Sequence, residues 1–281
     1  MDGIALWQAV VLGIVEGLTE YLPVSSTGHL TITEKLLGLP VDHVAVTAYT
    51  AIIQIGAIAA AVIYFWKDII KIIVAFVRGV FDRRAREVAE WRLACAVIVG
   101  SMPIAVVGYA FRHVISGPLR SLWVVAAGLI LWSGVMVFAE RAATHQRSER
   151  DVRLRDGLII GTVQIFSLIP GVSRSGATIS AGLLCDLDRV TATRLSFLLG
   201  IPALVAAGVF EAVETREEIS VHVGWTPTIV GTIVSFIVAY ASIAWLLRFV
   251  SRNSIIPFVW YRLGLGAAVI ALLGFGVITA T

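Results

Sequence analysis

The sequence is dominated by apolar runs long enough to cross a lipid bilayer. They occupy residues 45–66, 93–111, 121–139, 195–212, 225–247 and 257–279. A helix needs about 20 apolar residues to span roughly 30 Å of hydrocarbon. Of the 281 residues 58% are hydrophobic and only 15% charged, and the runs do not alternate apolar and polar residues as barrel strands do. The sequence therefore predicts an all-α polytopic membrane protein with about six transmembrane helices, folded as a single domain over residues 1–281.

Two further apolar segments are interrupted by proline. The first, residues 4–39, contains Pro23, and the second, residues 157–190, contains Pro170. Proline lacks the backbone donor that a continuing helix needs, and non-helical backbone at membrane depth is tolerated where protein buries it or where it lines a wet cavity. Each segment is therefore expected to form a re-entrant helix hairpin. The first helix is expected to end at about Leu22.

The two interrupted segments are similar at an offset of 148 residues. Gly13 aligns with Gly161, Glu16 with Gln164, Val24 with Val172, Ser25 with Ser173 and Gly28 with Gly176. This similarity predicts two repeats, residues 1–139 and 157–281, joined by a basic connection at 140–156.

The distribution of basic residues indicates how the repeats lie in a membrane. Residues 67–92 hold seven Lys or Arg, and residues 140–156 hold five. Basic loops favour the cytoplasmic side, which places the loops at 112–120 and 213–224 outside. The first hairpin then enters from outside and the second from the cytoplasm. This inverted-topology repeat is expected to bring the two hairpin tips together near the bilayer midplane. The net charge of +3 gives no reason to expect a nucleic-acid partner.

The first hairpin carries two carboxylates. Glu16 and Glu20 are four residues apart and share one face of a helix. Ionisable side chains in a membrane are costly, about 2.5–3.5 kcal/mol each at a helix centre, and are usually functional. Two adjacent carboxylates favour a divalent hard cation with oxygen ligands, such as Mg²⁺ or Ca²⁺. A proton-sharing pair, or a pair solvated by a cavity, is the alternative.

A hydroxyl-rich stretch follows at Ser25, Ser26 and Thr27, with His29 two residues later. An imidazole near a hydroxyl suits a general base for a nucleophile or a general acid for a leaving group. Ser26 is the favoured nucleophile and Ser25 its rival. An activated water and a purely structural role for these side chains are the alternatives.

The tip of the second hairpin offers donors for an anion. Its candidate residues are Gly171, Ser173, Arg174, Ser175, Gly176 and Thr178. Small residues at a helix N-terminus expose backbone N–H groups, and the arginine fork matches phosphate oxygens. The alternative is a structural ion pair between Arg174 and either Glu16 or Glu20.

The stretches EGLTEYLPVSSTGH and PGVSRSGAT resemble, without a gap, the two motifs of the bacterial undecaprenyl pyrophosphate phosphatases of the bacitracin-resistance (BacA/UppP) family. The resemblance implies a bacterial inner-membrane enzyme that hydrolyses undecaprenyl diphosphate to the monophosphate and inorganic phosphate. Such an enzyme recycles the lipid carrier for cell-wall synthesis and confers bacitracin resistance. The resemblance also implies a divalent cation and a site open to the periplasmic side.

A competing hypothesis is a lipid-carrier flippase or an ion-coupled transporter, because inverted repeats with broken helices are typical of secondary transporters. The partners expected from the sequence are a polyprenyl diphosphate and membrane lipids. A homodimer is left open.

Overall fold

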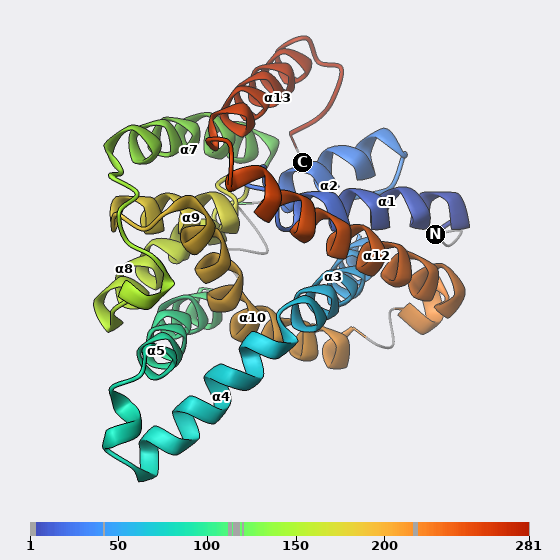
Figure 1. The fold of residues 1–281 in the computed structure, drawn as a ribbon. Coiled ribbons are helices and arrows are strands. Elements are labelled where there is room, and N and C mark those ends of the chain that lie inside the picture. Colours follow the sequence, from blue (N-terminus) through green and yellow to red (C-terminus); the bar gives the residue numbers. More distant parts are fainter. Residues whose placement is uncertain are drawn as a thin grey trace.

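The computed structural model describes residues 4–41, 43–111, 114, 119, 121–215 and 219–280. Within these residues the chain is helical, and six helices are long and apolar enough to cross a membrane (Figure 1). They are α3 (Val44–Tyr64), α5 (Ala89–Ala110), α7 (Leu122–Ala142), α10 (Arg189–Glu214), α12 (Trp225–Val250) and α13 (Ile256–Gly274). The predicted all-α polytopic class is confirmed. The predicted outer loops at 112–120 and 213–224 fall largely outside the described residues.

Both interrupted segments form helix hairpins. The first consists of α1 (Leu6–Thr19) and α2 (Ser26–Leu36), and the second of α8 (Leu154–Gln164) and α9 (Arg174–Leu184). The first helix ends at Thr19, three residues earlier than predicted. Pro23 disfavours helical backbone at Leu22 and so excludes that residue from the helix. The second helix begins at Ser26, so Ser25 is its N-cap and Ser26 and Thr27 lie in its first turn. The opposite orientation of the hairpins across a bilayer stays a prediction.

The two hairpins share an unusual tip. Ser25 has a φ of 76° and Ser173 has a φ of 75°, although neither is a glycine. Each serine side chain caps the following helix by accepting from a backbone N–H, that of Gly28 at 3.4 Å and that of Gly176 at 3.2 Å. Positive φ at such residues costs about 1–3 kcal/mol and persists where surrounding structure over-determines it. The same strained cap therefore occurs at two positions 148 residues apart.

The two halves of the chain interlock through close helix contacts at glycine. Helix α1 packs on α12, and α8 packs on α5. A Cβ at Gly13 would lie 2.6 Å from the carbonyl oxygen of Gly231, and one at Gly161 would lie closer still to that of Gly100. Each hairpin thus packs its first helix against a spanning helix of the other half.

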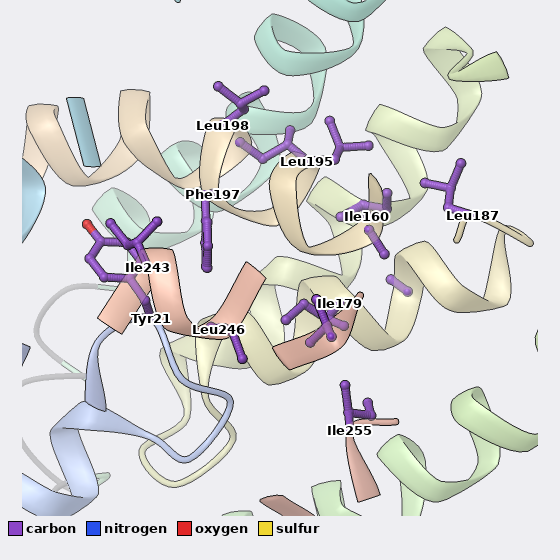
Figure 2. Close-up of a cluster of buried hydrophobic side chains, with 14 of the residues drawn as sticks. Tyr21, Ile160, Ile179, Leu187, Leu195, Phe197, Leu198, Ile243, Leu246 and Ile255 are labelled. Carbon is purple, nitrogen blue, oxygen red and sulfur yellow. The ribbon is translucent and has the colours of Figure 1, made fainter. Parts of the chain in front are cut away.

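A large apolar cluster lies beside the first hairpin tip and extends into α9, α10 and α12 (Figure 2). Tyr21 follows α1, packs edge-on against Phe197 with ring centroids 5.1 Å apart, and donates to the carbonyl of Ala57 at 2.8 Å. Both Tyr21 and Phe197 are at most 1% exposed. This packing holds the tip against the second half of the chain.

The basic stretch at 67–92, predicted as a loop, contains a helix, α4 (Trp66–Phe81), which projects from the bundle (Figure 1). Its apolar residues recur every three or four positions, as at Ile70, Val74 and Val77, which favours an amphipathic helix. Its inner face meets α5, where the ring of Phe76 stacks on Trp91 at 5.3 Å.

Candidate active site at the two hairpin tips

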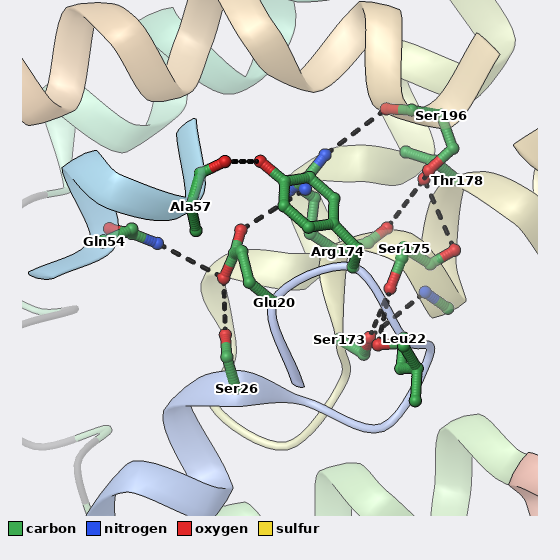
Figure 3. Close-up of polar contacts among 12 residues, drawn as sticks. Glu20, Leu22, Ser26, Gln54, Ala57, Ser173, Arg174, Ser175, Thr178 and Ser196 are labelled. Carbon is green, nitrogen blue, oxygen red and sulfur yellow. Dashed lines mark hydrogen bonds and ion pairs between the residues drawn. The ribbon is translucent and has the colours of Figure 1, made fainter. Parts of the chain in front are cut away.

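The two hairpin tips contact each other, as the repeat predicts (Figure 3). Arg174 Nη2 at the start of α9 lies 3.3 Å from Glu20 Oε1, just after the end of α1. The hydroxyl of Ser175 donates to the carbonyl of Leu22 at 2.9 Å. Side chains 154 residues apart in sequence therefore form one polar centre.

Glu20 is the hub of this centre. Its Oε2 accepts from the hydroxyl of Ser26 at 2.7 Å and from the side-chain amide of Gln54 at 3.4 Å, while Oε1 faces Arg174 (Figure 3). The Glu20 and Arg174 side chains are only 5% and 10% exposed. This is the arginine–glutamate pair that the sequence raised as an alternative. Breaking one partner out of a buried pair typically costs about 3–5 kcal/mol, so the pair helps to hold the two tips together.

The guanidinium of Arg174 is enclosed by residues of α10 and by the ring of Tyr21. Its Nη1 donates to the carbonyl of Ser196 at 3.3 Å, and its Cζ lies 5.8 Å from the ring centre of Tyr21. Gly200 on α10 leaves room for it, since a Cβ there would lie 2.7 Å from Arg174 Cζ. The Nε of Arg174 is buried without a hydrogen-bond partner among the described residues. The arginine therefore keeps one donor free.

The hydroxyls of the second tip brace the arginine rather than point into open space. Ser173 Oγ and Ser175 Oγ lie 3.1 Å apart, and Thr178 donates to the carbonyl of Arg174 at 2.8 Å. Ser175 and Thr178 are 0% exposed. The groups that remain for an anion are the guanidinium and the first-turn N–H groups of α9, which lack intrahelical partners.

The two glycines of the second tip, Gly171 and Gly176, determine the course of its backbone. Gly171 has a φ of 93°, and a Cβ there would collide with the carbonyl of Val125. The N–H of Gly176 is bonded to the cap at Ser173. Their predicted contribution to anion binding therefore acts through the shape of the tip.

His29 has partners other than the predicted one. Its Nδ1 lies 2.7 Å from the carbonyl oxygen of Ser25, and its Nε2 lies 2.7 Å from the hydroxyl of Tyr261 on α13. Ser26 instead donates to Glu20. The structure thus places a carboxylate, not the imidazole, against the candidate nucleophile. Thr27 is exposed, and its carbonyl accepts from Thr31.

The sequence analysis missed Arg262, a fully buried arginine on α13. Its guanidinium donates to the carbonyl of Pro23 at 3.2 Å and to that of Gly171 at 2.9 Å, so one side chain ties both tips together. Its other acceptors are the carbonyls of Gly128 and Leu129 and the hydroxyl of Ser133. The available signal was a lone arginine within an apolar span, which is costly and usually functional.

Within the described ranges, Glu16 has the unpaired carboxylate that either the predicted divalent cation or the alternative, a shared proton, requires. Glu16 is 1% exposed, and neither of its carboxylate oxygens has a hydrogen-bond partner in the described part of the chain. Such a group needs a proton or a cation. No cluster of three or more His, Cys, Asp or Glu side chains occurs among the described residues. Two carboxylates with neutral oxygens from Ser26 or Gln54 suit a hard cation that retains waters or binds phosphate.

Comparison with known proteins places the chain in a family. The family model for bacitracin resistance protein BacA matches residues 9–268. Undecaprenyl-diphosphatase 3 of Frankia casuarinae is 55% identical over 98% of this chain and 99% of its own length. The undecaprenyl-diphosphatases of Cutibacterium acnes and Acidothermus cellulolyticus are each 52% identical, over 97% and 100% of this chain and 99% and 100% of their own lengths. The chain therefore belongs to the bacitracin resistance protein BacA family.

Proposed function

We propose that this chain is a membrane phosphatase that hydrolyses undecaprenyl diphosphate to undecaprenyl phosphate and inorganic phosphate. Relatives at 50% identity or more, matched over nearly their whole length, carry the name undecaprenyl-diphosphatase. One observation supports this chemistry most directly. A serine hydroxyl donates to a carboxylate that is itself paired with an arginine from the other hairpin. A transporter has no need of a nucleophile in contact with a base.

Ser26 is the nucleophile in this proposal and Glu20 is its base. The Ser26 hydroxyl already points at Oε2 of Glu20 at 2.7 Å, within the reach that proton transfer requires. Ser25 is the weaker candidate because it is buried and its hydroxyl caps α2. Ser26 attacks the terminal phosphorus as its proton passes to Glu20, and the bond to the bridging oxygen breaks to give undecaprenyl phosphate. Water then cleaves the phosphoserine, which releases inorganic phosphate and restores Ser26.

Arg174 stabilises the charge of the transferred phosphoryl group. A phosphate offers the guanidinium two oxygens in a matching geometry, so the substrate competes with Glu20 for the fork. When Arg174 turns to the phosphate, Glu20 loses its charged partner and keeps the hydrogen bond from Ser26. Substrate binding and the environment of the base are thereby coupled through one ion pair. A divalent cation held by Glu16 and Glu20 would neutralise diphosphate charge and assist the leaving group.

We further propose that the protein lies in a bacterial inner membrane with the hairpin tips open to the periplasmic side. The supporting observation is the basic character of residues 67–92 and 140–156, which favours a cytoplasmic position for both. Undecaprenyl diphosphate is the expected partner, and its prenyl chain extends into lipid. Association of two copies stays a prediction.

The test is phosphate release from a polyprenyl diphosphate by the purified chain in detergent, with and without a chelator. Ser26→Ala should lower turnover at least about 1,000-fold, because the nucleophile is lost. Ser251→Ala, which removes a hydroxyl at the end of α12, is the matched control and should retain wild-type turnover. Absence of phosphate release from the wild type would refute the function. Turnover by Ser26→Ala near the wild-type rate would refute the assigned nucleophile.

A further inference from the structure

The hydrogen bonds of His29 determine which of its nitrogens carries a proton. Nδ1 faces the carbonyl oxygen of Ser25 at 2.7 Å, and a carbonyl only accepts, so Nδ1 is the protonated nitrogen of the neutral ring. Nε2 is then an acceptor, and the hydroxyl of Tyr261 donates to it at 2.7 Å. The only basic nitrogen of His29 is therefore occupied by a tyrosine from α13.

Tyr261 is firmly placed yet accessible. Its ring stacks on that of His29 with centroids 5.5 Å apart and an interplanar angle of 8°. Its chain neighbour, Arg262, is fixed to the carbonyls of both hairpin tips. Tyr261 itself is 51% exposed. The hydroxyl of Tyr261 is therefore held in position through Arg262 and is still accessible to a bound ligand.

The pair lies beside the phosphoryl-transfer centre. Ser26 and His29 are three residues apart on α2, so their side chains share one side of that helix. If Ser26 and Arg174 hold the terminal phosphoryl group, the other phosphate of the same diphosphate lies next to it, and the His29–Tyr261 pair is one helical turn away.

We propose that Tyr261 is a substrate-contacting residue whose hydroxyl binds the phosphate that stays on the lipid. This inference rests on the proposed function. In the structure, Tyr261 donates to His29 just as Arg174 donates to Glu20. A phosphate oxygen is a charged and therefore stronger acceptor than an imidazole nitrogen, so the bound lipid phosphate takes the hydroxyl. His29 Nε2 is then released to accept a proton from the water that cleaves the phosphoserine.

The test separates the two phosphates by product inhibition. Polyprenyl phosphate carries the phosphate assigned to Tyr261, whereas inorganic phosphate corresponds to the group assigned to Ser26 and Arg174. In Tyr261→Phe, inhibition by polyprenyl phosphate should weaken about ten-fold or more, the loss expected for one hydrogen bond to a charged group. Inhibition by inorganic phosphate should not change. Tyr240→Phe is the control, because it alters a part-exposed tyrosine on a different helix, α12. It should leave the inhibition constants of both products unchanged.

A second measurement keeps the native hydroxyl in place. With 3-fluorotyrosine at position 261, the ¹⁹F resonance should shift on addition of polyprenyl phosphate and not on addition of inorganic phosphate. Equal weakening of both inhibitors, or no weakening of either, would overturn the role of Tyr261, as would a fluorine resonance insensitive to the lipid phosphate. A wild-type chain that releases no phosphate would instead overturn the proposed function.

Discussion

Replacing Gly200 by alanine should inactivate the enzyme without unfolding it. A Cβ at this position would overlap Arg174 Nη1 and lie 2.7 Å from Cζ, whereas ordinary contact begins at 3.4 Å, so the guanidinium must move by more than about 1 Å. Two interactions fix that guanidinium, with Glu20 and with the carbonyl of Ser196, and both are already 3.3 Å long. Hydrogen bonds weaken beyond the usual 2.7–3.2 Å, so a further displacement of this size would break at least one of them.

The two expected effects have opposite signs. Misplacing a catalytic group by about 1 Å costs roughly 100-fold in rate, which is about 2.7 kcal/mol in the activation barrier. Alanine is favoured over glycine in a helix interior by about 0.5–1 kcal/mol, which offsets the cost of moving a flexible side chain. Turnover should therefore fall about 100-fold while the unfolding temperature stays near that of the wild type.

The assay is phosphate release and thermal unfolding of the same detergent preparation. Gly134→Ala on α7 is the matched control, because a Cβ there meets nothing within 4 Å. It should keep full turnover. Wild-type turnover in Gly200→Ala would show that the position of Arg174 is not critical. If the unfolding temperature and the turnover both fell sharply, the substitution would have disturbed helix packing rather than the position of the arginine.

Two further substitutions test the cation and the tip clamp. Glu16→Gln removes a buried carboxylate, so it should raise the Mg²⁺ concentration for half-maximal turnover about ten-fold or more with little loss of stability; an unchanged titration would contradict a ligand role. Arg262→Met leaves the carbonyls of Pro23 and Gly171 without a donor. It should lower the free energy of unfolding by about 3 kcal/mol or more, measured by denaturant titration in detergent, and a wild-type midpoint would contradict the clamp.

Much of the fold could be predicted because a membrane restricts the choices. Apolar runs long enough to span a membrane form helices, because a helix satisfies its own backbone hydrogen bonds. Pro23 and Pro170 mark where the two further apolar segments are interrupted. The matching residues of the two broken segments predicted matching tips, and the structure places the same positive-φ cap at Ser25 and Ser173. The ion pair of Arg174 with Glu16 or Glu20 was only the alternative interpretation of the sequence, and the structure shows it with Glu20.

The partners supplied by distant helices could not be read from local sequence. Tyr261 reaches His29 across 232 residues, and Gln54 reaches Glu20 from α3. Such contacts depend on how the helices pack, which residue spacing does not reveal. Arg262 was the exception, because an arginine in an apolar span was visible in the sequence and its cost required an explanation.

The repeat explains how one tip geometry supports two chemical roles. Ser26 and Arg174 are equivalent at the offset of 148 residues, and each is the first residue of the helix that follows its serine cap. Both contact the same carboxylate, Glu20. The equivalent caps thus bring a nucleophile from one half and a cation from the other to opposite oxygens of a shared base. Glu16 and its equivalent Gln164 are both buried without hydrogen-bond partners in the described part of the chain, but only Glu16 has an acidic group that could bind a cation. The divergence of these few side chains around two equivalent serine caps makes the two tips into an asymmetric active site.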